Sequence, residues 1–173
     1  NHAVGEIIVS HLQGGRTLVV RAPSCMPWQD QNFSGGESWA RAPSFEAVTD
    51  GVIIRVRPVF IDAESSPEDD KFLWAYHVEI ENRGKHTLQL MTRHWKITDG
   101  DGRMQEVKGE GVVGQQPVLR PGASFEYTSG CPLTTPSGLM QGAYQFEDEN
   151  GGAFEAKIPL FALDSPYDER RPN

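Results

Sequence analysis

The sequence predicts an all-β fold, an antiparallel β-sandwich of the immunoglobulin or fibronectin III type with about seven strands. Three observations predict it. Short apolar segments alternate with a period of two residues, turn-forming residues separate them, and no long stretch keeps the apolar stripe of an amphipathic helix. The 18 Gly and 12 Pro among 173 residues also favour many turns over long helices. A jelly roll or a small barrel is the alternative architecture.

The first 44 residues differ in character from the rest. Two apolar segments, 5–9 and 17–20, flank a turn at 13–16 and predict a β-hairpin. The segment 22–44 is rich in Pro, Ser, Gly and Asn, which predicts a linker. We expect residues 1–44 to be an extension of the domain: a native segment, the product of an incorrectly assigned start, or a remnant of an expression vector.

The sandwich domain is expected at residues 45–164. Between Phe72 and Glu81 the even-numbered positions are apolar or aromatic, so we expect them to face the core. Further short strands are expected at 52–57, 88–90, 95–97, 125–127, 144–146 and 154–160. Turn chemistry separates the strands at 82–85, 99–102, 120–122, 135–138 and 150–152. Residues 165–173 predict a disordered tail.

Charge and hydropathy argue against two classes of partner. The net charge of −8 repels phosphate backbones, and Lys and Arg are scattered along the chain, so we expect no nucleic-acid binding. No apolar run approaches the roughly 20 residues that span a bilayer, so we expect no membrane association. The sequence therefore predicts a soluble protein of the cytoplasm.

A Gly-rich segment matches the pattern G-x-G-x-x-G through Gly109, Gly111 and Gly114. In dinucleotide-binding folds such glycines let backbone N–H groups approach a pyrophosphate at the start of a helix. No helix is expected after the motif here, so a dinucleotide-binding fold is disfavoured. Two interpretations remain. The loop gathers N–H groups that bind an anion with help from Lys108 and Arg120, or its glycines only meet backbone requirements.

Candidate metal ligands occur without the spacing of a known site. His77, His86 and His94 are expected on neighbouring strands and are candidates for a transition metal. Five carboxylates of one expected loop are candidates for a hard cation: Asp62, Glu64, Glu68, Asp69 and Asp70. The segment 99–102 resembles the start of a calcium loop, but its flanks are strand-like, so we expect a hairpin turn. No cofactor is expected.

Catalytic patterns are lacking. The sequence holds no G-x-S-x-G, no H-E-x-x-H and no P-loop motif. Cys131 is expected to be a buried thiol that packs as a small apolar side chain. Because loop tips on a rigid sandwich are recognition surfaces more often than catalytic ones, we expect a binding protein and no enzyme.

Five segments carry a family resemblance: 92–99, 105–119, 125–130, 137–142 and 158–165. They resemble the ApaG family, also called CorD, and the resemblance implies a fibronectin III-like sandwich. Bacterial members are linked to cobalt resistance and magnesium efflux and are encoded beside a diadenosine tetraphosphate hydrolase. Similar eukaryotic domains look like protein-binding modules. The Gly-rich motif carries over intact, so the resemblance also implies pyrophosphate or nucleotide binding, and it implies no catalytic residues.

The leading hypothesis is a non-enzymatic interaction module that binds a protein partner in divalent-cation homeostasis through its loops, including 109–117. The alternative is a sensor whose Gly-rich loop binds a phosphate-containing small molecule, either pyrophosphate or a dinucleoside tetraphosphate. Direct metal binding is third. Hydrolysis of a phosphoanhydride comes last, because no general base or metal is in evidence. A homo-oligomer is an open prediction, since an exposed edge strand of a sandwich can pair with its copy.

Overall fold

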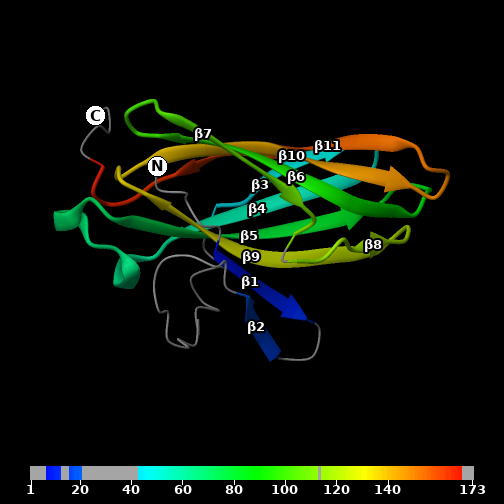
Figure 1. Ribbon diagram of the computed structural model, residues 1–173, viewed down its shortest axis with the longest axis horizontal. Coiled ribbons are helices and arrows are strands. Elements are labelled where there is room, and N and C mark those ends of the chain that lie inside the picture. Colours follow the sequence, from blue (N-terminus) through cyan, green and yellow to red (C-terminus); the bar gives the residue numbers. More distant parts are fainter. Residues whose placement is uncertain (1–6, 13–15, 21–42, 113, 169–173) are drawn as a thin grey trace.

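The computed structural model describes residues 7–12, 16–20, 43–112 and 114–168. Over these residues the chain is almost entirely β (Figure 1), and two single-turn 3-10 helices are its only helical segments: η1 (Asp62–Glu64) and η2 (Pro67–Asp69). The strands are β1 (Ile7–Leu12), β2 (Arg16–Val20), β3 (Phe45–Thr49), β4 (Val52–Phe60), β5 (Phe72–Asn82), β6 (Leu88–Asp99), β7 (Met104–Glu110), β8 (Val118–Leu119), β9 (Ser124–Leu133), β10 (Gly138–Asp148) and β11 (Ala153–Leu163). No helix of this part of the chain is long and apolar enough to cross a membrane.

The strands form two antiparallel sheets. The first has the order β2-β1-β9-β5-β4-β3, and the second has the order β11-β10-β6-β7, with β8 also paired to β6. The predicted β-sandwich is therefore confirmed, and a barrel is ruled out because the two sheets stay separate. The finer resemblance to the immunoglobulin and fibronectin III folds stays a prediction.

The number of strands differs from the prediction. The segments 88–90 and 95–97 belong to one long strand, β6, and three strands were not predicted: β3, β7 and β8. Strand β7 was missed because its residues are mostly polar and exposed, as befits the edge of a sheet, so no apolar alternation marks it. The short β8 follows a Pro and contributes only two residues.

The alternation predicted for β5 is confirmed. The side chains of Phe72, Trp74, Tyr76, Val78 and Ile80 are all at most 5% exposed. Successive strand residues point to opposite faces, so these five face the second sheet. The aromatic and β-branched residues that favour a strand locally are therefore the same ones that build the core.

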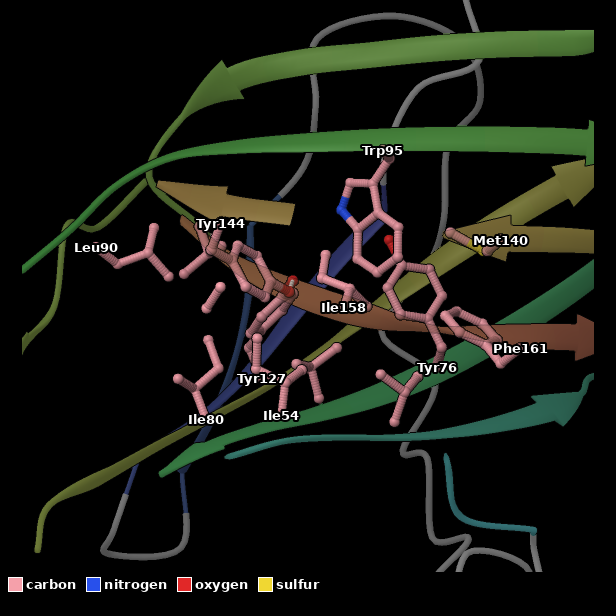
Figure 2. Close-up of a cluster of buried hydrophobic side chains, with 14 of the residues drawn as sticks. Ile54, Tyr76, Ile80, Leu90, Trp95, Tyr127, Met140, Tyr144, Ile158 and Phe161 are labelled. Atoms are coloured by element: carbon pink, nitrogen blue, oxygen red, sulfur yellow. Dashed lines mark hydrogen bonds between the residues drawn. The ribbon is translucent and has the colours of Figure 1, made fainter. Parts of the chain in front are cut away.

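The core lies between the two sheets and is rich in aromatic rings (Figure 2). Trp95 of β6 is 1% exposed, and its ring lies against those of Tyr76, Tyr144 and Phe161, with centroids 5.3 to 6.3 Å apart. The hydroxyl of Tyr144 in β10 is hydrogen-bonded to the hydroxyl of Tyr127 in β9. Because β9 and β10 belong to different sheets, this buried bond joins the two layers.

The two long borders of the sandwich are built differently. On one border, β11 packs against β3 and β4 of the opposite sheet. The rings of Phe45 and Phe161 meet there at 6.1 Å, and the amide of Lys157 donates a hydrogen bond to Thr49 Oγ1 at 3.4 Å. On the other border, β7 pairs with β6 alone among the described strands. We call these the closed border and the open border.

The segment before residue 45 was predicted to hold a hairpin and a linker. Strands β1 and β2 form an antiparallel pair where the hairpin is predicted, and β1 also pairs with β9 of the first sheet. The predicted linker falls on residues outside those described, except for Pro43 and Ser44.

The predicted disordered tail is wrong for residues 165–168. Ser165 is 3% exposed and its hydroxyl donates to the carbonyl of Pro136 at 2.6 Å. The ring of Tyr167 packs on those of Phe60 and Phe72 at about 6 Å. The charged composition misled the prediction, because one aromatic ring suffices to dock the segment on the domain. The rest of the predicted tail, 169–173, lies outside the described residues.

Candidate functional site

The Gly-rich segment lies on the open border, between the end of β7 and the start of β8. Both strands pair with β6, so the segment bridges two collinear stretches of the same sheet edge. Gly109 is the second-to-last residue of β7, and Gly111 and Gly114 follow the strand. The motif therefore leads from a strand into a loop, and no helix follows it, as the sequence predicted.

Gly109 leaves room for an arginine. A Cβ atom at this position would stand 2.6 Å from Nη1 of Arg93, which lies on the neighbouring strand β6. The same Nη1 donates hydrogen bonds to the carbonyls of Glu110 and Gly111, at 3.1 and 3.0 Å. The absence of a Cβ at 109 thus leaves the space that the guanidinium of Arg93 occupies while it binds the start of the loop.

The loop is closed by its own backbone. The amide of Val112 donates to the carbonyl of Gln115, and the amide of Gln115 donates to that of Val112, both at 2.8 Å. Gly111 has φ of 63°, and a Cβ there would overlap the carbonyl oxygen of Gln115. Gly114 has φ of 71° with open space around it. Positive φ is costly for any residue with a Cβ, so these two glycines meet backbone requirements.

These bonds limit the loop as an anion site. The amide of Gly111 donates to the carbonyl of Met91 at 2.8 Å, so three loop amides, those of residues 111, 112 and 115, already have backbone partners. Of the predicted cations, Lys108 lies in β7 with its Nζ 3.9 Å from Glu106, and Arg120 follows β8. An anion here would have to use other donors or open the loop. The predicted anion site stays a prediction.

Comparison with known proteins shows what the chain is related to. The family model described as the ApaG domain matches residues 62–148, which include the whole Gly-rich segment. The chain belongs to the ApaG family. It is 57% identical to Protein ApaG of Rhodospirillum centenum over 129 residues, which are 75% of this chain and 99% of that relative. Protein ApaG of Brucella suis is 50% identical over the same share of each chain.

A solved structure supports the same assignment. The crystal structure of an ApaA protein from Bordetella pertussis aligns with a TM-score of 0.66 and 50% sequence identity, covering 68% of this chain and 95% of that one. The ApaG domain of this chain thus has the same β-sandwich fold as that relative.

The three histidines predicted as metal ligands in this ApaG protein do not come together. His77 lies on β5 of the first sheet and His94 on β6 of the second, each beside an inward-facing core residue, so their side chains point away from the sandwich on opposite sides. His86 lies in the connection between these strands, 3.1 Å from Glu149. Among the described residues no group of three or more His, Cys, Asp or Glu side chains is placed to hold a metal ion.

The acidic residues 62–70 form the two single-turn helices between β4 and β5. The hydroxyl of Tyr167 donates a hydrogen bond to Asp62 of this segment at 2.8 Å. This bond, with a smaller effect of burial, raises the pKa of Tyr167 above its usual value. The acidic segment therefore contacts the segment around Tyr167.

The predicted hairpin turn at Asp99–Gly102 is confirmed. Asp99 Oδ1 accepts hydrogen bonds from the amides of Asp101 and Arg103, at 2.9 and 3.0 Å, and the turn joins β6 to β7. One oxygen of the Asp99 carboxylate, a candidate calcium ligand, thus binds amides of the turn itself. Cys131 is 1% exposed, which confirms the buried thiol.

A small pocket of about 140 Å³ lies at one end of the sandwich, beside the connection between β5 and β6. Its polar lining is used internally. The amide group of Asn82 donates to the carbonyls of His86 and Leu119, at 2.8 and 3.0 Å, and Asp148 Oδ1 accepts from the amides of residues 150 and 152. These two polar side chains of the pocket therefore stabilise the backbone around it.

Sequence reasoning found the Gly-rich loop but missed the side chains that hold it. Gln116 Nε2 donates to the carbonyl of Met91 at 3.0 Å, and Gln89 Nε2 donates to the carbonyl of Gln116 at 3.2 Å. The exposed apolar side chain of Val118 lies directly after the loop. No motif marks Arg93, Gln89 or Gln116, because their role depends on the pairing of β6 with β7 and β8.

Proposed function

We propose that this ApaG protein is a non-catalytic binding module and that the open border binds a protein partner. The contact surface we assign, called the loop surface, consists of the exposed residues of the loop and its flanks: Glu110, Gly114, Gln115, Gln116 and Val118. Loops on a rigid β-sandwich are common recognition surfaces.

The observation that carries the proposal is that hydrogen bonds within the protein hold the described residues of the loop. Arg93 binds its first turn, Gln116 and Gln89 fasten its second half to β6, and the amide of Leu90 donates to the carbonyl of Pro117 at 3.0 Å. A surface that is ordered before binding loses less conformational entropy when a partner docks. Val118 is 59% exposed and supplies an apolar contact beside the polar loop.

The test compares two matched valines. Val118 is 59% exposed on the open border, and Val48 is 61% exposed on the closed border. The tagged full chain and its Val118→Asp and Val48→Asp variants are used to capture proteins from a lysate of Rhodospirillum centenum, whose ApaG is 57% identical. We expect a partner that the wild type and Val48→Asp retain and that Val118→Asp loses. Equal recovery by all three proteins would contradict the proposal.

The cellular setting that we propose is divalent-cation homeostasis, which the ApaG family resemblance supports. In a bacterial strain that lacks its own ApaG, we expect the wild type and Val48→Asp to restore growth in cobalt and Val118→Asp to fail. If all three proteins restored growth, the loop surface would not be needed for cobalt tolerance.

Phosphate binding is the second candidate function. The guanidinium of Arg93 lies beside Gly109, which supports an anion at this border, whereas Lys108 is on the opposite face of β7. Binding would have to break the backbone bonds of the loop or use the amide of Gly114. Titration of the labelled protein with pyrophosphate or a dinucleoside tetraphosphate would then shift only the amides between Gly109 and Gln115. Shifts over the whole surface, or none, would exclude this function.

A further inference from the structure

One side of the β7 backbone meets no second strand in the part of the chain that the structure describes. Strand β7 pairs with β6 through residues from Thr98↔Met104 to Thr92↔Glu110, and no other described strand pairs with it. Figure 1 shows β7 along one border of the molecule, on the side opposite β1 and β2. An edge strand with unpaired N–H and C=O groups is a template for another strand.

The hydrogen bonds at the two ends of this ladder show which groups are open. The amide of Asp99 donates to the carbonyl of Arg103, and the amide of Gly111 donates to that of Met91. In an antiparallel ladder hydrogen-bonded pairs alternate with non-hydrogen-bonded pairs. The odd-numbered residues of β7 therefore bond to β6. The backbone groups of the even-numbered residues point to the open side: Met104, Glu106, Lys108 and Glu110.

We propose that β7 pairs with β7 of a second copy of this chain, antiparallel, with the two-fold axis between the two Val107 residues. In this register Glu106 stands opposite Lys108 of the second copy, and Lys108 stands opposite Glu106 of the second copy. Met104 and Glu110 form the outer pairs. All four open residues then form hydrogen-bonded pairs, which is about eight backbone hydrogen bonds across the interface.

The alternating charges on β7 select this register. A shift of the register that centres the axis on Glu106 places two carboxylates opposite each other. A shift that centres it on Lys108 sets two ammonium groups opposite each other and also pairs Glu106 with Glu110. Like charges directly opposite are destabilising, whereas opposite charges stabilise the pair. Centring on Gly109 also pairs opposite charges but keeps only half of the open residues within the strand.

The side chains of Glu106 and Lys108 are solvent-exposed and lie 3.9 Å from each other within one chain, so pairing would add a second contact of the same kind across the interface. Lys108 is 70% exposed and Glu106 is 43% exposed, and Glu106 already lies 3.2 Å from His94 Nε2 on the outer face of the sheet. Pairing would join the β11-β10-β6-β7 sheets of both copies into one continuous sheet. This inference does not rest on the proposed function: the two surfaces share Glu110, but the proposed function is tested at Val118 and this inference at residues 104–108 of β7.

Charge exchange tests the register. The full chain is studied by sedimentation equilibrium over a wide concentration range, with thermal melts to confirm folding. We expect a monomer–dimer equilibrium in the wild type, a dissociation constant raised at least about tenfold by Glu106→Lys, and recovery in the double variant Glu106→Lys, Lys108→Glu. The double variant restores opposite charges across the axis. A wild type that is monomeric throughout, or a dimer that Glu106→Lys leaves unchanged, overturns the proposal.

A disulfide tests the position of the axis. The two Val107 residues form a non-hydrogen-bonded pair, in which Cα atoms lie about 4.5 Å apart, within the range that a disulfide spans. In a Cys25→Ser background, Val107→Cys is expected to give a disulfide-linked dimer with oxidised glutathione. Met104→Cys, about 20 Å from its counterpart along the strand, is expected to give none. Any other pattern overturns the proposed register.

Discussion

The two borders of the sandwich use similar strands for different purposes. At the closed border, β11 meets β3 and β4, and aromatic rings such as Phe45 and Phe161 fill the space between the sheets. At the open border, the amides of residues 111, 112 and 115 bond to the backbone, side chains of β6 bind the loop carbonyls, and β7 pairs with β6 alone among the described strands. Apolar packing between the sheets thus marks the closed border, and exposed polar residues mark the open one.

The largest expected effect lies at the closed border. Phe161 is 1% exposed and its ring contacts those of Phe45, Tyr76 and Trp95. Phe161→Ala leaves a cavity between the sheets, so we expect it to lower the free energy of unfolding by about 3–5 kcal/mol in urea denaturation. Phe161→Leu keeps much of the volume and serves as the control, with a smaller loss. Equal losses would show that the site collapses around the cavity.

The next effect lies at the open border and compares two glycines. Gly111 and Gly114 both have positive φ, but only at Gly111 would a Cβ meet the carbonyl of Gln115. We expect Gly114→Ala to cost about 1–2 kcal/mol from its backbone conformation alone, and Gly111→Ala to cost clearly more. Denaturation of the two variants measures the difference. A smaller loss for Gly111→Ala would mean that the loop relaxes without strain.

A smaller effect concerns acid. The pKa of Glu81 on β5 is lowered, mainly by a hydrogen bond from Arg83 and next by one from Arg55, which also binds Glu46 of β3. A carboxyl with a lowered folded-state pKa stabilises the fold above its unfolded value, which is about 4.5, and this contribution is lost as the pH falls through the folded value. We expect Arg83→Ala to raise the pKa of Glu81 in a carboxyl NMR titration. An unchanged value would show that Arg55 alone holds it.

The smallest effect on stability is expected at the two exposed valines. Val48→Asp and Val118→Asp replace exposed side chains, one at each border, so each is expected to change the free energy of unfolding by less than about 0.5 kcal/mol. Thermal melts check this. The pair then isolates binding from folding, because only Val118 belongs to the loop surface. A large loss of stability in Val118→Asp alone would instead make that residue part of the fold.

Local patterns predicted the fold well where one face of a strand is buried. The even-numbered residues of β5 are apolar because that face meets the core, although Leu73 and Ala75 on the other face are also buried. The turn at Asp99–Gly102 carries its own side-chain acceptor. Strand β7 was not predicted, because an edge strand has little buried surface and so shows no apolar alternation. The packing of Tyr167 was not predicted, because it depends on Phe60 and Phe72, which lie far away in the sequence.

The all-β class, the main core-facing positions, the position of the Gly-rich loop and the resemblance to the ApaG family all follow from local patterns of residues. The pairing and packing of the strands were needed to show that His77 and His94 lie on opposite sheets, that Arg93 occupies the space beside Gly109, and that the two borders of the sandwich differ. The reason is physical. Periodicity and turn chemistry act over a few neighbouring residues, whereas the pairing of strands brings together residues from distant parts of the chain.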